Sequence, residues 1–102
     1  MLIVTGEFGR TPRLERMDGR IGRDHWPSAM SILVSGGGMR MGQVIGATTR
    51  NGERPRERPL DPHDILATVY HHLGIDFNYQ HVDPTGRPIS LARGEVVREL
   101  YG

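Results

Sequence analysis

The chain has 102 residues, enough for one small domain or for part of a larger one. Its 13 basic residues, all arginine, nearly balance 12 acidic residues, and the net charge of +1 excludes a polyanion binder driven by bulk charge. No apolar stretch approaches the roughly 20 residues of a membrane span, and the absence of cysteine excludes a disulfide framework and a zinc–sulfur site.

Strands are the first elements that the sequence predicts. Residues 1–5 form a continuous apolar run that ends at Gly6, a pattern typical of a strand buried on both faces of a parallel sheet. Residues 13–24 are polar, rich in arginine and interrupted by glycine, which predicts a loop. A second strand is predicted over residues 28–35 and a weaker third over residues 43–48.

A helix over residues 62–73 has the clearest local signals in the chain. Asp61 is in position to cap its N-terminus, Pro62 suits the first helical position, and Asp64 lies in the first turn. Gly74 follows as the stop. The apolar residues between them recur at helical spacing and predict one buried face.

The remaining segments complete an α/β pattern with few strands. Residues 49–60 contain two prolines and four arginines and are predicted to form an exposed connection. Residues 86–91 predict a short strand and residues 95–101 a last turn or two of helix. Two or three strands and one good helix do not close a doubly wound sheet, and 14 glycines with 7 prolines leave room for a thin core only.

The first candidate site lies directly after the first strand. Glu7 is a potential metal ligand, and Arg10, three residues later, can pair with Glu7 or hold an oxyanion. A structural Glu7–Arg10 ion pair that fixes the loop explains the same spacing. Both interpretations stay open on the sequence.

The second candidate site is the segment Arg23-Asp24-His25-Trp26. Its position between a glycine-rich loop and a strand allows the His25 imidazole to point into a cleft, with Asp24 as co-ligand or as a group that orients the ring. The alternative is a loop histidine that packs on Trp26.

Other polar and glycine-rich features favour structural roles. The glycines at 36–38 match neither a Walker loop nor a dinucleotide-binding fingerprint, and tight turns explain them better than an anion cradle does. His63, His71 and His72 are predicted on the helix surface or rim. The stretch 50–58 holds the only concentration of arginine, but two glutamates reduce its charge and no aromatic residues alternate with it, so no nucleic-acid partner is expected.

Several segments together resemble one family. They are EFGRTPR at 7–13, GRDHWP at 22–27, GGG at 36–38, RPLDPHDILATVYHHLGID at 58–76 and GRPISL at 86–91. They resemble the C-terminal part of a domain-of-unknown-function family of sulfatase-like proteins in the alkaline phosphatase superfamily. The resemblance covers nearly the whole chain.

This resemblance implies a fold and an activity. It implies an α/β fold in which residues 1–102 are the C-terminal portion of one sulfatase-like domain, without an internal boundary. The sheet would be mixed, mostly parallel and flanked by helices. Proteins of the superfamily hydrolyse phosphate or sulfate esters with divalent metal ions, so the resemblance implies a small ester substrate and Zn, Ca or Mg as cofactor. It also implies export to the periplasm or the cell exterior.

The resemblance also assigns site residues. Glu7 and His25 fall at positions of metal ligands, and Arg10 and Asp24 belong to the family's own motifs and are expected to line the catalytic site. Phe8 occupies the place of a histidine ligand and cannot bind a metal ion. Thr49 stands where the family pattern has an aspartate, which removes a loop contact.

Two hypotheses follow from these assignments. In the first, the chain is part of a metal-dependent ester hydrolase and is inactive on its own. In the second, it is a non-catalytic binding or assembly module with a degenerate metal site, as Phe8 suggests.

Overall fold

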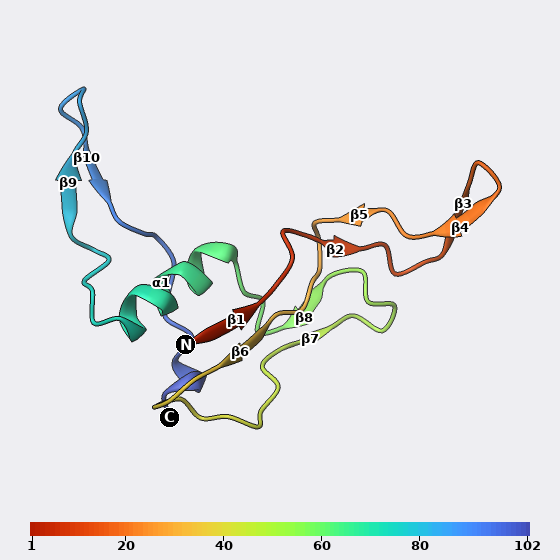
Figure 1. The fold of residues 1–102 in the computed structure, drawn as a ribbon, viewed down its shortest axis with the longest axis horizontal. Helices are drawn as coiled ribbons and strands as arrows, with labels where there is room; N and C mark the ends of the chain where they lie inside the picture. Colours follow the sequence, from red (N-terminus) through yellow and green to blue (C-terminus); the bar gives the residue numbers. More distant parts are fainter. The chain divides into compact units, whose positions relative to one another are not determined.

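The computed structural model describes residues 1–102 and contains ten short strands, one α-helix and one 3-10 helix (Figure 1). The strands have two or three residues each and pair only two by two, always antiparallel. No helix has the length and apolar character that crossing a membrane requires. The helical elements are α1 (Pro62–His72) and η1 (Arg98–Leu100), and the strands are β1 (Leu2–Val4), β2 (Gly9–Arg10), β3 (Glu15–Met17), β4 (Arg20–Gly22), β5 (His25–Trp26), β6 (Leu33–Ser35), β7 (Ala47–Thr48), β8 (Pro55–Glu57), β9 (Gln80–Val82) and β10 (Pro88–Ser90).

The chain divides into two compact units. Unit 1 consists of Met1, Gly37–Met41 and Leu60–Gly102 and contains α1, β9, β10 and η1. Unit 2 consists of Leu2–Gly36 and Gly42–Pro59 and contains β1 to β8. All buried apolar side chains belong to unit 1, whereas unit 2 buries only Thr11; the apolar set is Met39, Ala67, Ala92, Val96, Val97 and Leu100.

Helix α1 confirms the prediction for residues 62–73, ending one residue earlier. The Asp61 carboxylate accepts a hydrogen bond from the backbone N–H of His63 at 2.8 Å, and the Asp64 carboxylate accepts one from the N–H of Asp61 at 2.8 Å. This reciprocal pair is a capping box. Gly74 follows the C-cap residue with φ 72°, a conformation that glycine adopts without steric cost.

The C-terminal segment packs against the N-terminal half of α1. The Thr68 hydroxyl donates to the Asp64 carbonyl at 2.7 Å and accepts from the Val97 N–H at 2.9 Å, so one buried side chain joins both segments. Gly94 lies so close to the helix that a Cβ atom there would be 2.6 Å from the carbonyl carbon of His63. Close backbone packing therefore depends on glycine at this position.

The helix histidines lie where the sequence places them. His63 and His71 are exposed and His72 is half-buried, which fits surface and rim positions. His71 meets the Tyr101 ring edge-on with centroids 4.9 Å apart, and the Tyr101 hydroxyl lies 3.4 Å from Nδ1 of His72. Burial raises the pKa of the Tyr101 hydroxyl above its ordinary value of 10.0.

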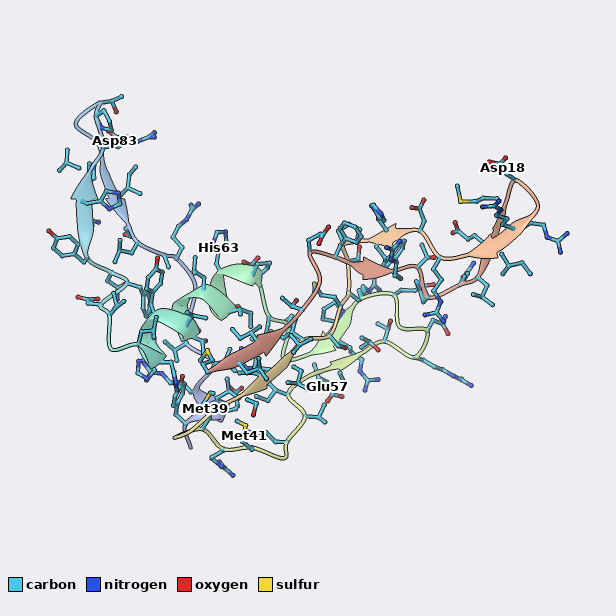
Figure 2. The ribbon with its side chains drawn as sticks, viewed as in Figure 1. Asp18, Met39, Met41, Glu57, His63 and Asp83 are labelled. Atoms are coloured by element: carbon cyan, nitrogen blue, oxygen red, sulfur yellow. The ribbon has the colours of Figure 1, made fainter.

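A hairpin of β9 and β10 confirms the strand predicted at 86–91, and Figure 2 shows Asp83 at its turn. The Asp83 Oδ1 atom accepts from the Thr85 N–H at 2.8 Å, the Thr85 hydroxyl at 2.6 Å and the Arg87 N–H at 2.9 Å. These donors stabilise the ionised carboxylate, and they lower the pKa of Asp83 below its ordinary value of 3.8.

The predicted fold class, an α/β fold with a mostly parallel, sulfatase-like sheet flanked by helices, is wrong. The first strand is present as β1, but it pairs antiparallel with β6, and Ile3 lies opposite Val34. Leu2 and Val4 are 58% and 57% exposed, so β1 is not buried on both faces. No sheet in the chain has more than two strands.

The order of elements explains the antiparallel pairing. Parallel neighbours need a crossover connection, most often a helix, between them. The residues between β1 and β6 instead form a hairpin, and the only α-helix comes after β1 to β8. No strand–helix–strand unit can therefore form among the strands of unit 2. An apolar run such as residues 1–5 is compatible with a parallel or an antiparallel neighbour, so the run alone does not predict the pairing.

We call residues 9–26 the arm, a long irregular hairpin formed by β2, β3, β4 and β5 (Figure 1). Arg10 pairs with His25 and Glu15 with Gly22, so residues 11–14 on the outgoing side face only residues 23–24 on the returning side. Asp18, at the tip in Figure 2, and Gly19 have φ angles of 49° and 74°, as a tight Asp-Gly hairpin turn requires. The loop predicted over residues 13–24 is thus mostly an ordered hairpin.

The other strand predictions are confirmed in shortened form. The strand predicted at 28–35 is β6, and the weaker one at 43–48 is β7. Residues 49–60, predicted as a connection, include β8, which pairs with β7. The exposed burial pattern of β8 agrees with the predicted exposure of this segment.

Candidate anion-binding site

The base of the arm brings three of the four predicted site residues together. Arg10 on β2 and His25 on β5 are direct partners in the antiparallel ladder, and Asp24 precedes His25. Glu7 lies in the bend before β2. All four side chains belong to exposed residues, so they are accessible to a ligand.

Phe8 organises the side chains around Arg10. Its ring stacks on the His25 imidazole with centroids 3.8 Å apart and an angle of 29° between the planes. The Arg10 guanidinium carbon lies 5.5 Å from the centre of the same ring, within the range of a cation–π contact. His25 therefore packs on Phe8, and Arg10 interacts with Phe8 rather than pairing with Glu7.

Thr11 fixes the strand opposite Arg10. The Thr11 hydroxyl accepts a hydrogen bond from the Asp24 N–H at 3.1 Å and donates one to the Arg13 carbonyl at 3.0 Å. The Thr11 N–H donates to the Asp24 carbonyl at 3.0 Å, and the Asp24 carboxylate accepts from the His25 N–H at 2.7 Å. Asp24 is thus held by its backbone and engaged locally, which suits a positioning role better than direct contact with a ligand.

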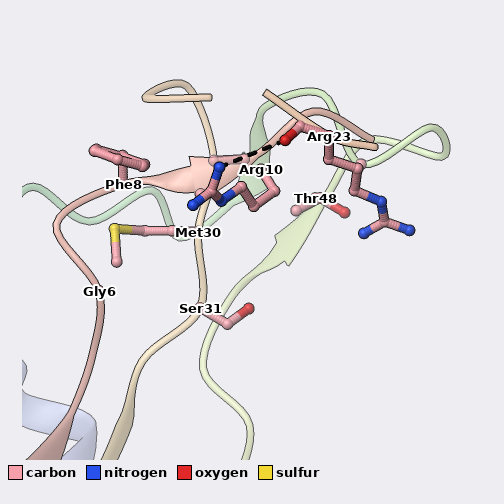
Figure 3. A pocket seen from close by; sticks show the side chains of 10 residues that line it. Gly6, Phe8, Arg10, Arg23, Met30, Ser31 and Thr48 are labelled. Carbon is pink, nitrogen blue, oxygen red and sulfur yellow. Dashed lines mark hydrogen bonds between the residues drawn. The ribbon is translucent and has the colours of Figure 1, made fainter. Parts of the chain in front are cut away.

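Arg10 lines an open hollow of about 280 Å³ in unit 2 (Figure 3). Polar groups come from Arg10, Arg23, Ser31 and Thr48, and no aspartate or glutamate contributes; the other lining residues are Gly6, Phe8, Gly9, Ala29, Met30 and Gly52. Arg10 and Arg23 are therefore the only charged residues that line the hollow.

The Arg10 guanidinium is directed into this hollow. Its Nη1 atom donates to the Arg23 carbonyl at 3.4 Å, and Figure 3 shows the guanidinium on the side of Phe8 and Met30. The side chain of Arg23 extends in the opposite direction, so its guanidinium does not join that of Arg10. A guanidinium has five N–H donors, and this hydrogen bond leaves others for an anion.

Gly9 allows the hollow to form. A side chain at this position would collide with the backbone carbonyl of Ala29. The absence of a Cβ atom therefore lets the segment with Ala29 and Met30 approach the arm. This close approach was not visible in the sequence, where Gly9 is one of many glycines.

The residues do not fit a resident metal ion. Glu7 and His25 are the two ligands that the sequence proposes, and nowhere in the chain do three or more His, Asp or Glu side chains gather as a metal-holding group. The His25 ring is stacked on Phe8, the residue that replaces a third ligand in the resemblance. Two donors alone fall short of the three or four protein ligands of a zinc site.

Several residues of the hollow were missed by the sequence analysis. Met30, Ser31 and Thr48 lie on segments that come together only through the arm and β7. The sequence identifies Phe8 only as a lost ligand, although an aromatic residue two positions before an arginine is compatible with a cation–π pair. Periodicity gives no signal for such contacts.

The hollow is a surface site that arginine residues line and to which no carboxylate contributes. The chain itself belongs to the family described as "Protein of unknown function (DUF1501)", whose model matches residues 1–101. This confirms the family level of the resemblance. No curated protein and no solved structure matches the chain.

Proposed function

We propose that the chain supplies the oxyanion-binding part of a sulfatase-like, ester hydrolase-type domain that acts on phosphate or sulfate esters. The observation that carries this proposal is the hollow, which Arg10 lines and to which no carboxylate contributes. The motifs that support the resemblance, at 7–13 and 22–27, are the outgoing and returning sides of the arm base.

The chemistry of the hollow favours a tetrahedral oxyanion. A guanidinium donates hydrogen bonds in a planar fork that matches phosphate and sulfate oxygens. Ser31 and Thr48 also line the hollow, and a hydroxyl side chain can donate a hydrogen bond to an anion. In this proposal Arg10 contacts the anion, and Asp24 and Thr11 position the strand that carries His25.

Removing Arg10 should weaken anion binding. In the intact protein, Arg10→Ala is expected to lower the affinity for inorganic phosphate and sulfate about tenfold to a hundredfold, since hydrogen bonds to charged groups contribute roughly 1.5–3 kcal/mol. Isothermal titration calorimetry measures this change. Arg16→Ala, at an exposed arginine on β3 outside the hollow, removes the same charge and should leave the affinity unchanged.

Catalysis is tested with the same variants. The intact protein should release nitrophenolate from 4-nitrophenyl phosphate or 4-nitrophenyl sulfate, and Arg10→Ala should abolish this release. Anion binding that does not respond to Arg10→Ala would refute the assignment of the hollow.

A second candidate function is a binding module that lacks turnover. The stack of Phe8 on His25 favours it, because the imidazole is engaged by a residue that cannot bind a metal. This candidate predicts Arg10-dependent anion binding without hydrolysis and without stoichiometric divalent metal in the intact protein. One or two tightly bound metal ions that are lost in His25→Ala would favour the hydrolase instead.

A further inference from the structure

A second hollow of about 280 Å³ lies beside the arm and shares no residue with the hollow around Arg10. We call it the Trp26 hollow. Two of its lining residues are glutamates and one is an arginine, so its carboxylates outnumber its cations by one. The complete lining is Thr11, Pro12, Arg13, Glu15, Trp26 and Glu53.

Hydrogen bonds hold the backbone around the Trp26 hollow. The Trp26 indole N–H donates to the Glu53 carbonyl at 2.7 Å, which connects β5 to the turn between β7 and β8. The Thr11 hydroxyl donates to the Arg13 carbonyl at 3.0 Å, and Glu15 is the first residue of β3. The aromatic ring and both glutamates therefore project from ordered segments.

Arg13 shows which kind of group the Trp26 hollow accepts. Its Nη2 atom lies 3.4 Å from Oε1 of Glu53, so a guanidinium of the chain itself lies beside one of the two carboxylates. The Arg13 side chain is 80% exposed, and an exposed ion pair of this kind contributes little. Glu15 forms no ion pair. A cationic ligand can therefore displace Arg13 at low cost and also interact with Glu15.

The indole of Trp26 adds a second attraction for a cation. Trp26 is half-buried, so part of its ring system remains accessible from the hollow. Among aromatic side chains tryptophan attracts cations most strongly, and a planar guanidinium can also stack on the ring. A neutral ligand of the same shape gains neither the charge attraction nor the cation–π contact.

We propose that the Trp26 hollow binds a guanidinium cation, which displaces Arg13 from Glu53 and is held by Glu53, Glu15 and the Trp26 ring. The cation is either a free guanidinium compound or the arginine side chain of a peptide, since both present the same group. This site is independent of the proposed anion-binding function.

Fluorescence titration of the intact protein tests the inference, because Trp26 is the only tryptophan among the 102 residues. Methylguanidinium, at constant ionic strength, is expected to change the Trp26 emission with an affinity in the millimolar range. N-Methylurea, a neutral molecule of similar shape, should not. Tighter binding of an acetylated and amidated Ala-Arg-Ala peptide would identify a peptide as the ligand, and equal affinity a free guanidinium compound.

Two variants should change the affinity for methylguanidinium in opposite directions. Glu53→Gln is expected to lower it about twofold to fivefold, the range of one exposed ion pair. Arg13→Ala should raise it by a similar factor because the competing guanidinium is gone, a gain that a purely structural role of Arg13 does not produce.

A matched control is Glu57→Gln, at an exposed glutamate on β8 that does not line the Trp26 hollow. This variant should leave the affinity unchanged. Equal binding of methylguanidinium and N-methylurea would overturn the inference, and so would an Arg13→Ala variant that binds no more tightly than the wild type. Neither result bears on anion binding at Arg10.

Discussion

Thr11 shows how one residue can hold a site in a part of the chain that has no apolar core. It is 5% exposed and is the only buried residue of unit 2. Its hydroxyl accepts a hydrogen bond from the Asp24 N–H and donates one to the Arg13 carbonyl. These bonds lie where residues 11–14 of the arm face only residues 23–24. The hydroxyl therefore compensates for ladder hydrogen bonds that the unequal strands cannot form.

Replacing Thr11 by valine keeps the shape but removes this hydroxyl. Thr11→Val should destabilise the arm base by about 1 kcal/mol, because two backbone groups lose a hydrogen-bond partner in a partly buried position. The Asp24 amide should then exchange with deuterium faster, as NMR can measure, and anion affinity should fall. Thr11→Ser retains the hydroxyl and should behave like the wild type; unchanged Asp24 exchange in the valine variant would contradict this role.

At the scale of elements, the β9–β10 hairpin depends on the ionised Asp83 carboxylate. The pKa of Asp83 is lower in the folded chain than its ordinary 3.8, because the hydroxyl and N–H of Thr85 and the N–H of Arg87 donate to the carboxylate. A carboxylate with a lowered pKa stabilises the fold above its unfolded pKa, and this contribution disappears as the pH falls through the folded pKa.

The hairpin should therefore loosen in acid, below about pH 4. The amide chemical shifts of Thr85 and Arg87, followed by NMR between neutral pH and pH 2, should move together with the titration of Asp83. Asp83→Asn should remove this titration and weaken the turn at neutral pH, where the wild-type carboxylate is ionised. A hairpin whose Thr85 and Arg87 shifts stay constant down to pH 2 would contradict the prediction.

The elements also show how far the sequence determines the fold. Helix α1 could be predicted almost to the residue because its signals are local: Asp61 and Asp64 cap one end and Gly74 the other. Residues 1–5 are a strand as predicted, but their partner depends on the chain between β1 and β6. An apolar run does not distinguish a parallel from an antiparallel neighbour, so the fold class was predicted wrongly.

The candidate site was predictable to a similar extent. Arg10, Asp24 and His25 were selected from their motifs, and the arm does bring them together. The partner of His25 was not predictable, because Phe8 and His25 meet only through the pairing of β2 with β5. The approach of Met30 and Thr48 to Arg10 was not predictable either, because it depends on contacts between segments that no local sequence pattern encodes.

On the scale of the whole molecule, stability should differ between the two units. Unit 1 contains every buried apolar side chain, including Val97 at 1% exposure, whereas unit 2 relies on ladders of two or three residues. Buried apolar contacts set the resistance of a region to local opening.

Hydrogen–deuterium exchange measured residue by residue should reveal this difference. Amides of α1 and the Val97 amide should exchange at least about tenfold more slowly than amides of β1 to β8, since the latter open without exposing a buried core. Unit 2 should also bind a hydrophobic dye, because Leu2, Val4 and Leu33 are each more than half exposed. Equal protection across both units would contradict this prediction.

The hollow around Arg10 is built from three stretches of unit 2, residues 6–10, 23–31 and 48–52. A ligand that contacts all three stretches connects segments that have no buried apolar core in common. By mass action such a ligand favours the arranged form over the loosened one. Part of the free energy of association then goes into ordering the polypeptide, so binding should slow the exchange of amides well beyond the contact residues.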